Sequence, residues 1–137
     1  MKHSKRLIAA ALLLATTTTA LADEDADIPP LALAAAKARA IEFIGPKMSH
    51  QQAQIIGENY ATVNWSEDKC DRPRGLWFRL LAMMAKEKDQ TVFMHGMAIG
   101  VAKLVDLENT KSRAGMCESF WGFYGKGSKQ LFDGALE

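Results

Sequence analysis

The segment Met94-His95-Gly96-Met97 carries residue types that suit a soft metal ion. Thioether sulfur and imidazole nitrogen both bind copper, which proteins handle in oxidising compartments. Met94 and Met97 are three residues apart and share a helix face, whereas His95 is rotated about 100° from Met94. Methionine packing in an irregular core explains the same pattern. A small-ligand or copper carrier using Met94, His95 and Met97 is one hypothesis, and no other cofactor is expected.

Cys70 and Cys117 are the two cysteines of the chain. In an exported protein such a pair is most simply a disulfide. The bridge would close a loop of 47 residues, which stabilises the fold by roughly 3–4 kcal/mol in the chain-entropy model. The alternative is a reactive thiol at Cys70, which lies among charges of both signs and lacks a Cys-x-x-Cys partner. The sequence favours the structural bridge.

No catalytic constellation is apparent in the sequence. His50 and His95 follow the N-terminal segment, and neither has metal-ligand spacing to another histidine or cysteine. The glycine- and lysine-containing stretch at 125–129 resembles a phosphate-binding loop but lacks the full Walker spacing and a preceding strand. Gly125 as a helix C-cap explains it better. Enzymatic activity is therefore uncertain, a non-catalytic protein is favoured, and we nominate no catalytic residue.

Trp65 and Trp121 are candidate anchors for a protein partner, because tryptophan is enriched at binding hot spots. Trp65 falls in a polar stretch expected to be a loop, and Trp121 is rotated away from the helix face of Phe120, Phe123 and Tyr124. Core packing is the alternative for both. The expected partner is another protein or a second copy of the chain. The near-neutral net charge of +1 argues against nucleic acid.

The N-terminus has the three regions of a secretory signal peptide. Positive charges precede an apolar run at 7–15, and Ala20-Leu21-Ala22 offers a cleavage point between Ala22 and Asp23. Nine apolar residues fall short of the roughly 20 that span a bilayer. We expect export by the general secretory pathway to the periplasm, with extracellular release as the alternative. No integral membrane span is expected after signal cleavage.

Removal of residues 1–22 leaves 115 residues with 14 basic and 16 acidic side chains, a net charge of −2. Residues 23–30 are expected to be a flexible acidic lead, and 31–137 a single helical domain. Alanine, leucine and methionine outnumber valine and isoleucine, and no strict alternation indicates a strand. The fold class is therefore all-α: a small bundle of about five helices stapled by one disulfide.

The expected helices lie at 31–44, at 49–63, from about 73 to a charged end at 86–89, from a cap at Asp89 or Thr91 through 105, and at 112–124. Polar loops are expected at 64–74 and 107–111, and a short helical turn at 131–132. Ser49 and Gln52 form the pattern of a capping box. Gly96 and Gly100 are four apart, which favours close approach of two helices. A ligand pocket at these glycines is the alternative.

Three functions follow from these features. The first is a small exported, non-catalytic protein that acts through protein–protein contact. The second is an acid-stress chaperone: the chain is similar to the acid-stress periplasmic chaperones in its cysteine spacing, and also to small helical periplasmic immunity proteins. Protonation of sixteen carboxylates near pH 3 would leave a positive chain that exposes apolar helix faces. The third is the carrier described above.

Overall fold

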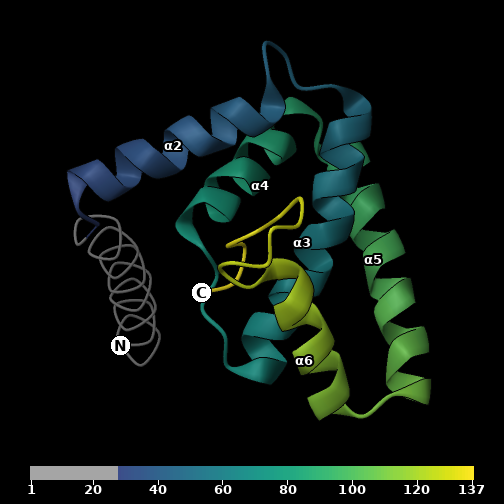
Figure 1. Cartoon of the computed structure of the whole chain (residues 1–137). Coiled ribbons are helices and arrows are strands. Elements are labelled where there is room, and N and C mark those ends of the chain that lie inside the picture. The colour runs from purple at the N-terminus through teal and green to yellow at the C-terminus, as the bar shows by residue number, and fades with distance from the viewer. Residues whose placement is uncertain (1–27) are drawn as a thin grey trace, which may run out of the picture. The chain divides into compact units, whose positions relative to one another are not determined.

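The computed structural model describes residues 28–137, and these are built of helices and loops (Figure 1). The expected signal peptide, its cleavage point between Ala22 and Asp23, and residues 23–27 of the expected lead lie outside the described residues. Residues Ala34–Glu137 form one compact unit. Within residues 28–137 the helices are α2 (Pro30–Ile44), α3 (His50–Cys70), α4 (Leu76–Lys88), α5 (Gln90–Thr110) and α6 (Arg113–Tyr124). The all-α prediction is confirmed.

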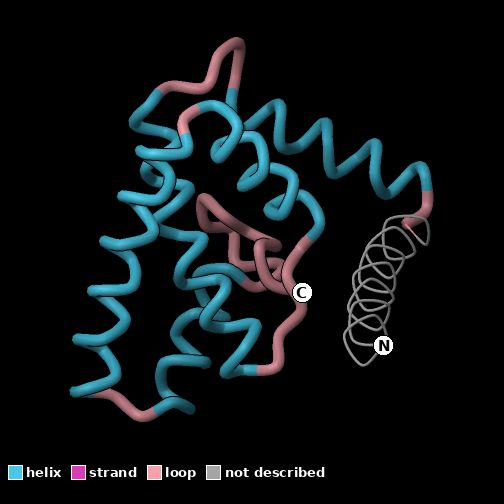
Figure 2. The backbone as a smooth tube through the Cα atoms, turned by 180° about the vertical axis from the view of Figure 1, so that it is seen from behind, coloured by secondary structure: helices cyan, strands magenta, loops and turns pink. Residues whose placement is uncertain are grey.

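Helix α3 is the element against which α4, α5 and α6 all pack. Its start is fixed by the capping box: the Gln52 amide donates to Ser49 Oγ (3.0 Å) and the Ser49 amide donates to Gln52 Oε1 (2.8 Å). Helix α5 lies along α3 in both views of the backbone (Figures 1 and 2). Helices α3, α4 and α5 are therefore held in mutual contact.

Glycines allow the backbones of α3 and α5 to touch. A Cβ on Gly96 would lie 2.1 Å from the Gln54 carbonyl oxygen, and one on Gly57 would lie 2.2 Å from the Phe93 carbonyl oxygen. Both distances are far below van der Waals contact, so only glycine fits at these two positions. The prediction that Gly96 marks a close helix approach is confirmed, and Gly57 supplies the matching gap on α3.

Two helices are longer than expected. Helix α3 continues through 64–70, where a polar loop was predicted, and α5 continues to Thr110 through most of the predicted loop at 107–111. In the α3 extension Ser66 is buried whereas Asn64 is exposed. Its polar residues therefore occupy the solvent side of an amphipathic helix, and the loop prediction was wrong because polarity alone does not distinguish the two.

The beginning of α4 is shifted to Leu76 from the predicted position near 73, because the preceding residues pair with the C-terminal segment. The Gly75 amide donates to the Ala135 carbonyl (2.9 Å) and the Glu137 amide donates to the Pro73 carbonyl (2.8 Å). A turn is present at 131–134, as expected for this region, but no helix forms there. Buried side chains of this segment join the core: Phe132, Ala135 and Leu136.

Candidate functional site

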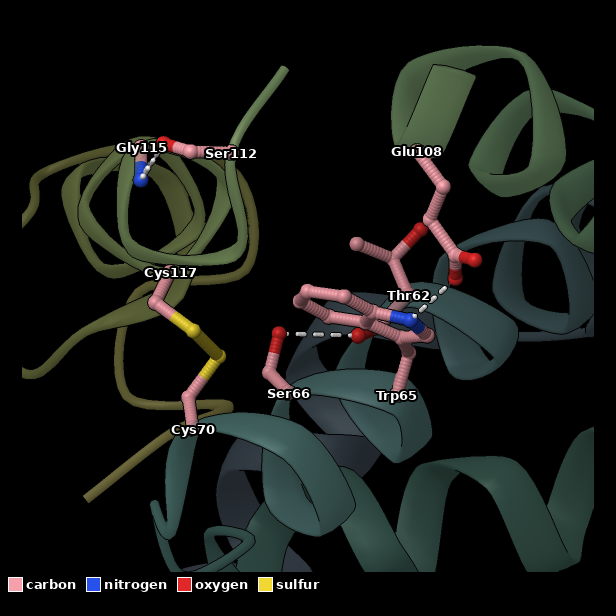
Figure 3. Close-up of a disulfide and its surroundings, with 8 residues drawn as sticks. All are labelled: Thr62, Trp65, Ser66, Cys70, Glu108, Ser112, Gly115 and Cys117. Atoms are coloured by element: carbon pink, nitrogen blue, oxygen red, sulfur yellow. Dashed lines mark hydrogen bonds between the residues drawn. A yellow bond between two sulfur atoms is a disulfide. The ribbon is translucent and has the colours of Figure 1, made fainter. Parts of the chain in front are cut away.

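The predicted disulfide is present and joins the last residue of α3, Cys70, to Cys117 on α6 (Figure 3). It closes the 47-residue separation that the sequence sets. No free cysteine remains. The bridge therefore ties the far end of α3 to α6 and leaves no thiol for the nucleophilic alternative considered for Cys70.

Trp65 lies on α3 rather than in a loop, and its indole is engaged within the protein. Its Nε1 donates to Glu108 Oε1 on α5 (2.7 Å), and its ring meets the Phe120 ring edge-on at 5.6 Å between centroids. Figure 3 shows the indole lying across the gap between α3 and Glu108. The half-buried Trp65 thus links three helices, which is a structural role whether or not a partner also contacts it.

Trp121 lies on α6, and it too is half-buried with intramolecular partners. The Arg72 guanidinium carbon stands 4.2 Å from the centroid of its ring. A Cβ on Gly125 would lie 2.6 Å from Trp121 Cδ2, so the indole covers the C-cap residue of α6. Phe123, which was expected to share an inward face with Phe120 and Tyr124, is instead exposed because α6 turns that side toward solvent.

Methionine side chains gather in a groove of about 430 Å³ between α4 and α5. Met94 and Met97 line it from α5 and Met83 lines it from α4. His95 is exposed and is not among the residues that line this groove. The structure therefore brings together two of the three proposed metal residues with an additional methionine, and it separates the histidine from them.

Basic side chains line the same groove, and no carboxylate does. Arg74 is held in place: its Nη1 donates to the Tyr60 hydroxyl (2.9 Å), its Nη2 donates to Asn64 Oδ1 (2.7 Å), and its Nε pairs with Glu67 at 2.9 Å. Arg79 and Lys86 are the other two cations. Basic side chains around neutral thioethers oppose the binding of a copper ion and favour an anion, although Glu67 balances part of the charge of Arg74.

A second, smaller groove of about 270 Å³ runs along the other side of Met83, between α2 and α4. Ile41, Leu80 and Met84 form its apolar lining. Ile41 is 58% exposed, Met83 57% and Met94 47%. Because Met83 lines both grooves, the apolar surface is continuous across three helices. We call this surface the methionine face; its members are Ile41, Leu80, Met83, Met84, Met94 and Met97.

Little in the sequence pointed to the basic residues of this site. Arg79, Met83 and Lys86 follow one another at i, i+4 and i+7 on α4, a spacing that places them along one stripe. The same spacing is common on helix faces exposed to solvent, so it did not single out these residues. Met116 on α6 lies apart from these methionines and is buried in a separate cluster with Ala61 and Leu104.

Two titratable groups with shifted pKa values, Asp133 and Tyr124, do not line the groove between α4 and α5. The amides of Gly127 and Lys129 donate to the Asp133 carboxylate and lower its pKa, so the loop that resembled a phosphate-binding site has its amides occupied by an internal carboxylate. Burial raises the pKa of Tyr124 to about 12, and its hydroxyl bonds to Asn59. Between residues 28 and 137, no cluster of three His, Cys, Asp or Glu side chains is arranged to hold a metal.

None of the helices between residues 28 and 137 combines the length and apolar character needed to cross a lipid bilayer. No protein-family model, no curated protein and no solved structure matches the chain. The methionine face contains three large apolar side chains that are about half exposed or more, Ile41, Met83 and Met94.

Proposed function

We propose that this is an exported, non-catalytic protein that acts through protein–protein contact, with the methionine face as its contact surface. The observation that carries the proposal is the continuity of exposed apolar side chains from Ile41 through Met83 to Met94. Isolated exposed apolar residues are ordinary, but a contiguous patch typically marks an interaction site. Flexible, polarisable methionine is frequent on surfaces that adapt to a partner.

The proposed location is the periplasm, reached by the general secretory pathway with cleavage between Ala22 and Asp23. The Cys70–Cys117 bridge supports an oxidising compartment, because structural disulfides are rare in the cytosol. N-terminal sequencing of the protein from a periplasmic fraction should begin at Asp23. An uncleaved chain recovered from the cytoplasm would contradict this part of the proposal.

Site-specific crosslinking tests the contact surface. The variant Met83→p-benzoylphenylalanine, made in the cells that produce the protein and irradiated, is expected to give a discrete crosslinked species, either with another protein or with a second copy. The matched control places the same residue at exposed Glu118 on α6, away from the methionine face. No crosslink from position 83, or equal crosslinking from position 118, would contradict the proposal.

An acid-activated chaperone is the second candidate, favoured by the carboxylate of Asp89. Hydrogen bonding from the Val92 amide lowers its pKa, and the same side chain pairs with His50 at 2.7 Å. Asp89 is the residue between α4 and α5, so its protonation loosens the two helices that bear Met83 and Met94. The test is whether the purified protein keeps an acid-denatured client soluble at pH 3 and not at pH 7.

A further inference from the structure

We propose that the groove between α4 and α5 receives an acidic, amphipathic helical segment of a partner protein. The inference rests on the proposed contact function and adds the chemistry of what is contacted. The groove combines an apolar floor with basic side chains along its rim. Neither the exported location nor the disulfide requires that combination.

The charge of the groove is one-sided. Arg74, Arg79 and Lys86 line it, and no carboxylate does. The acidic residue of α4, Glu87, lines the other groove, and α5 has no acidic residue before Asp106. Glu67 balances part of the charge of Arg74, and Arg79 also has a partner within the protein, whereas Lys86 makes no ion pair within residues 28–137. A partner bearing carboxylates would meet complementary charge along this rim.

The apolar part of the groove is suited to side chains that project from a helix. Phe93 is buried at its base, and Met83, Met94 and Met97 form walls that can change rotamer at little energetic cost. An amphipathic helix places anchors at i, i+3 or i+4 and i+7 into a groove of this kind. Two neighbouring helices also present the ridges and grooves into which a third helix packs.

The openness of the groove favours an extended partner over a small anionic amphiphile. Met83 and Met94 are about half exposed, so a single acyl chain would leave much of their surface in water. A helix lying across Met83 would also cover Leu80 and Ile41 in the adjoining groove. The acidic helix therefore accounts for both the charge of the rim and the length of the apolar surface.

The probes are two dye-labelled synthetic 18-residue peptides with leucine at matching i, i+3, i+4, i+7 positions, one with glutamate and one with lysine on the polar face. Fluorescence anisotropy measures their binding to the disulfide-bonded protein at low ionic strength. We expect the glutamate peptide to bind about tenfold more tightly than the lysine peptide. Equal binding of the two, or tighter binding of the lysine peptide, would overturn the inference.

Two pairs of variants locate the binding. Lys86→Glu should weaken the glutamate peptide about fivefold or more, whereas Lys126→Glu makes the same charge change at an exposed loop residue and should have little effect. Met83→Asp should also weaken it, and Phe123→Asp on the exposed side of α6 should not. Circular dichroism confirms that all four variants are folded. Equal effects within either pair would overturn the inference.

Failure here is distinguishable from failure of the proposed function. A crosslink from position 83 to a partner, together with no preference for the glutamate peptide, would retain protein contact and reject the acidic helix. Displacement of the dye-labelled peptide is also measured with laurate as a competitor. Laurate binding that depends on Lys86, without binding of either peptide, would reject the helix in favour of a small amphiphile.

Discussion

The hydrogen atom that serves as the side chain of Gly96 sets the distance between α3 and α5. With the Gln54 carbonyl oxygen only 2.1 Å from where a Cβ would be, even a methyl group requires α3 and α5 to separate. Gly57 imposes the same limit from the α3 side. The spacing of four residues between Gly96 and Gly100 predicted this approach, whereas nothing in the sequence marked Gly57 as its counterpart.

Gly96→Ala is expected to lower the free energy of unfolding by about 1–3 kcal/mol, because the new methyl group meets backbone rather than a movable side chain. The control is Gly122→Ala on α6, where nothing lies within 4 Å of the new Cβ. There alanine should raise stability by up to about 1 kcal/mol through its better helix propensity. Urea unfolding measures both variants, and a Gly96→Ala protein as stable as the parent would refute the backbone contact.

A single residue, Asp89, both ends α4 and begins α5. Its amide donates to the Ala85 carbonyl (3.2 Å), and its carboxylate accepts a hydrogen bond from the Val92 amide (3.1 Å). The ion pair with His50 adds the start of α3 to the same junction. The relative placement of the two helices that form the groove therefore depends on one charged carboxylate.

The sign of the resulting pH dependence follows from the lowered pKa of Asp89. In the folded protein the pKa of Asp89 lies below its ordinary value of 3.8. The ionised carboxylate therefore stabilises the fold above pH 3.8, and this stabilisation is lost as the pH falls through the folded-state pKa. Asp89→Asn keeps a capping oxygen and removes the charge. We expect the variant to show a smaller loss of stability between pH 5 and pH 2 than the parent protein.

Urea midpoints at several pH values in that range measure this difference. Asp106→Asn, an exposed carboxylate on α5, is the control and should retain the pH dependence of the parent. Identical pH dependence of the Asp89→Asn variant and the parent would mean that other carboxylates control acid unfolding, and it would remove the support for the acid-chaperone candidate.

On the scale of the whole molecule, two long-range connections hold the helices together. The disulfide joins α3 to α6, and the C-terminal segment joins α6 to α4. The Leu136 amide donates to the Tyr124 carbonyl at 2.9 Å, and the Leu136 side chain is 1% exposed. The last residues of the chain are therefore part of the core.

Leu136→Ala should lower the free energy of unfolding by about 2–5 kcal/mol, the range for removing a leucine side chain from a packed core. The matched control is Leu131→Ala in the same segment, where the side chain is 66% exposed and the change should stay within about 0.5 kcal/mol. Thermal and urea unfolding measure both. Equal effects of the two substitutions would show that this segment does not pack as described.

The helical class, the disulfide and the principal helix caps could be predicted from the amino-acid sequence alone. These depend on local or unique chemistry: Ser49 and Asp89 cap amides within three residues, and a chain with two cysteines has one possible internal pairing, Cys70 with Cys117. The same local rules did not distinguish a polar loop from the solvent face of a helix at 64–70, because both contain the same residue types.

Which surface is available for function depends on how the helices pack. The methionines of α4 and α5 and the cations around them form a groove because α3 holds those helices in place, and no spacing along the chain encodes that contact. The burial of Leu136 likewise depends on a distant contact, the pairing of its backbone with Arg74, some 60 positions earlier. Propensity and capping act over a few residues, whereas a binding surface is made by residues that folding brings together from distant parts of the chain.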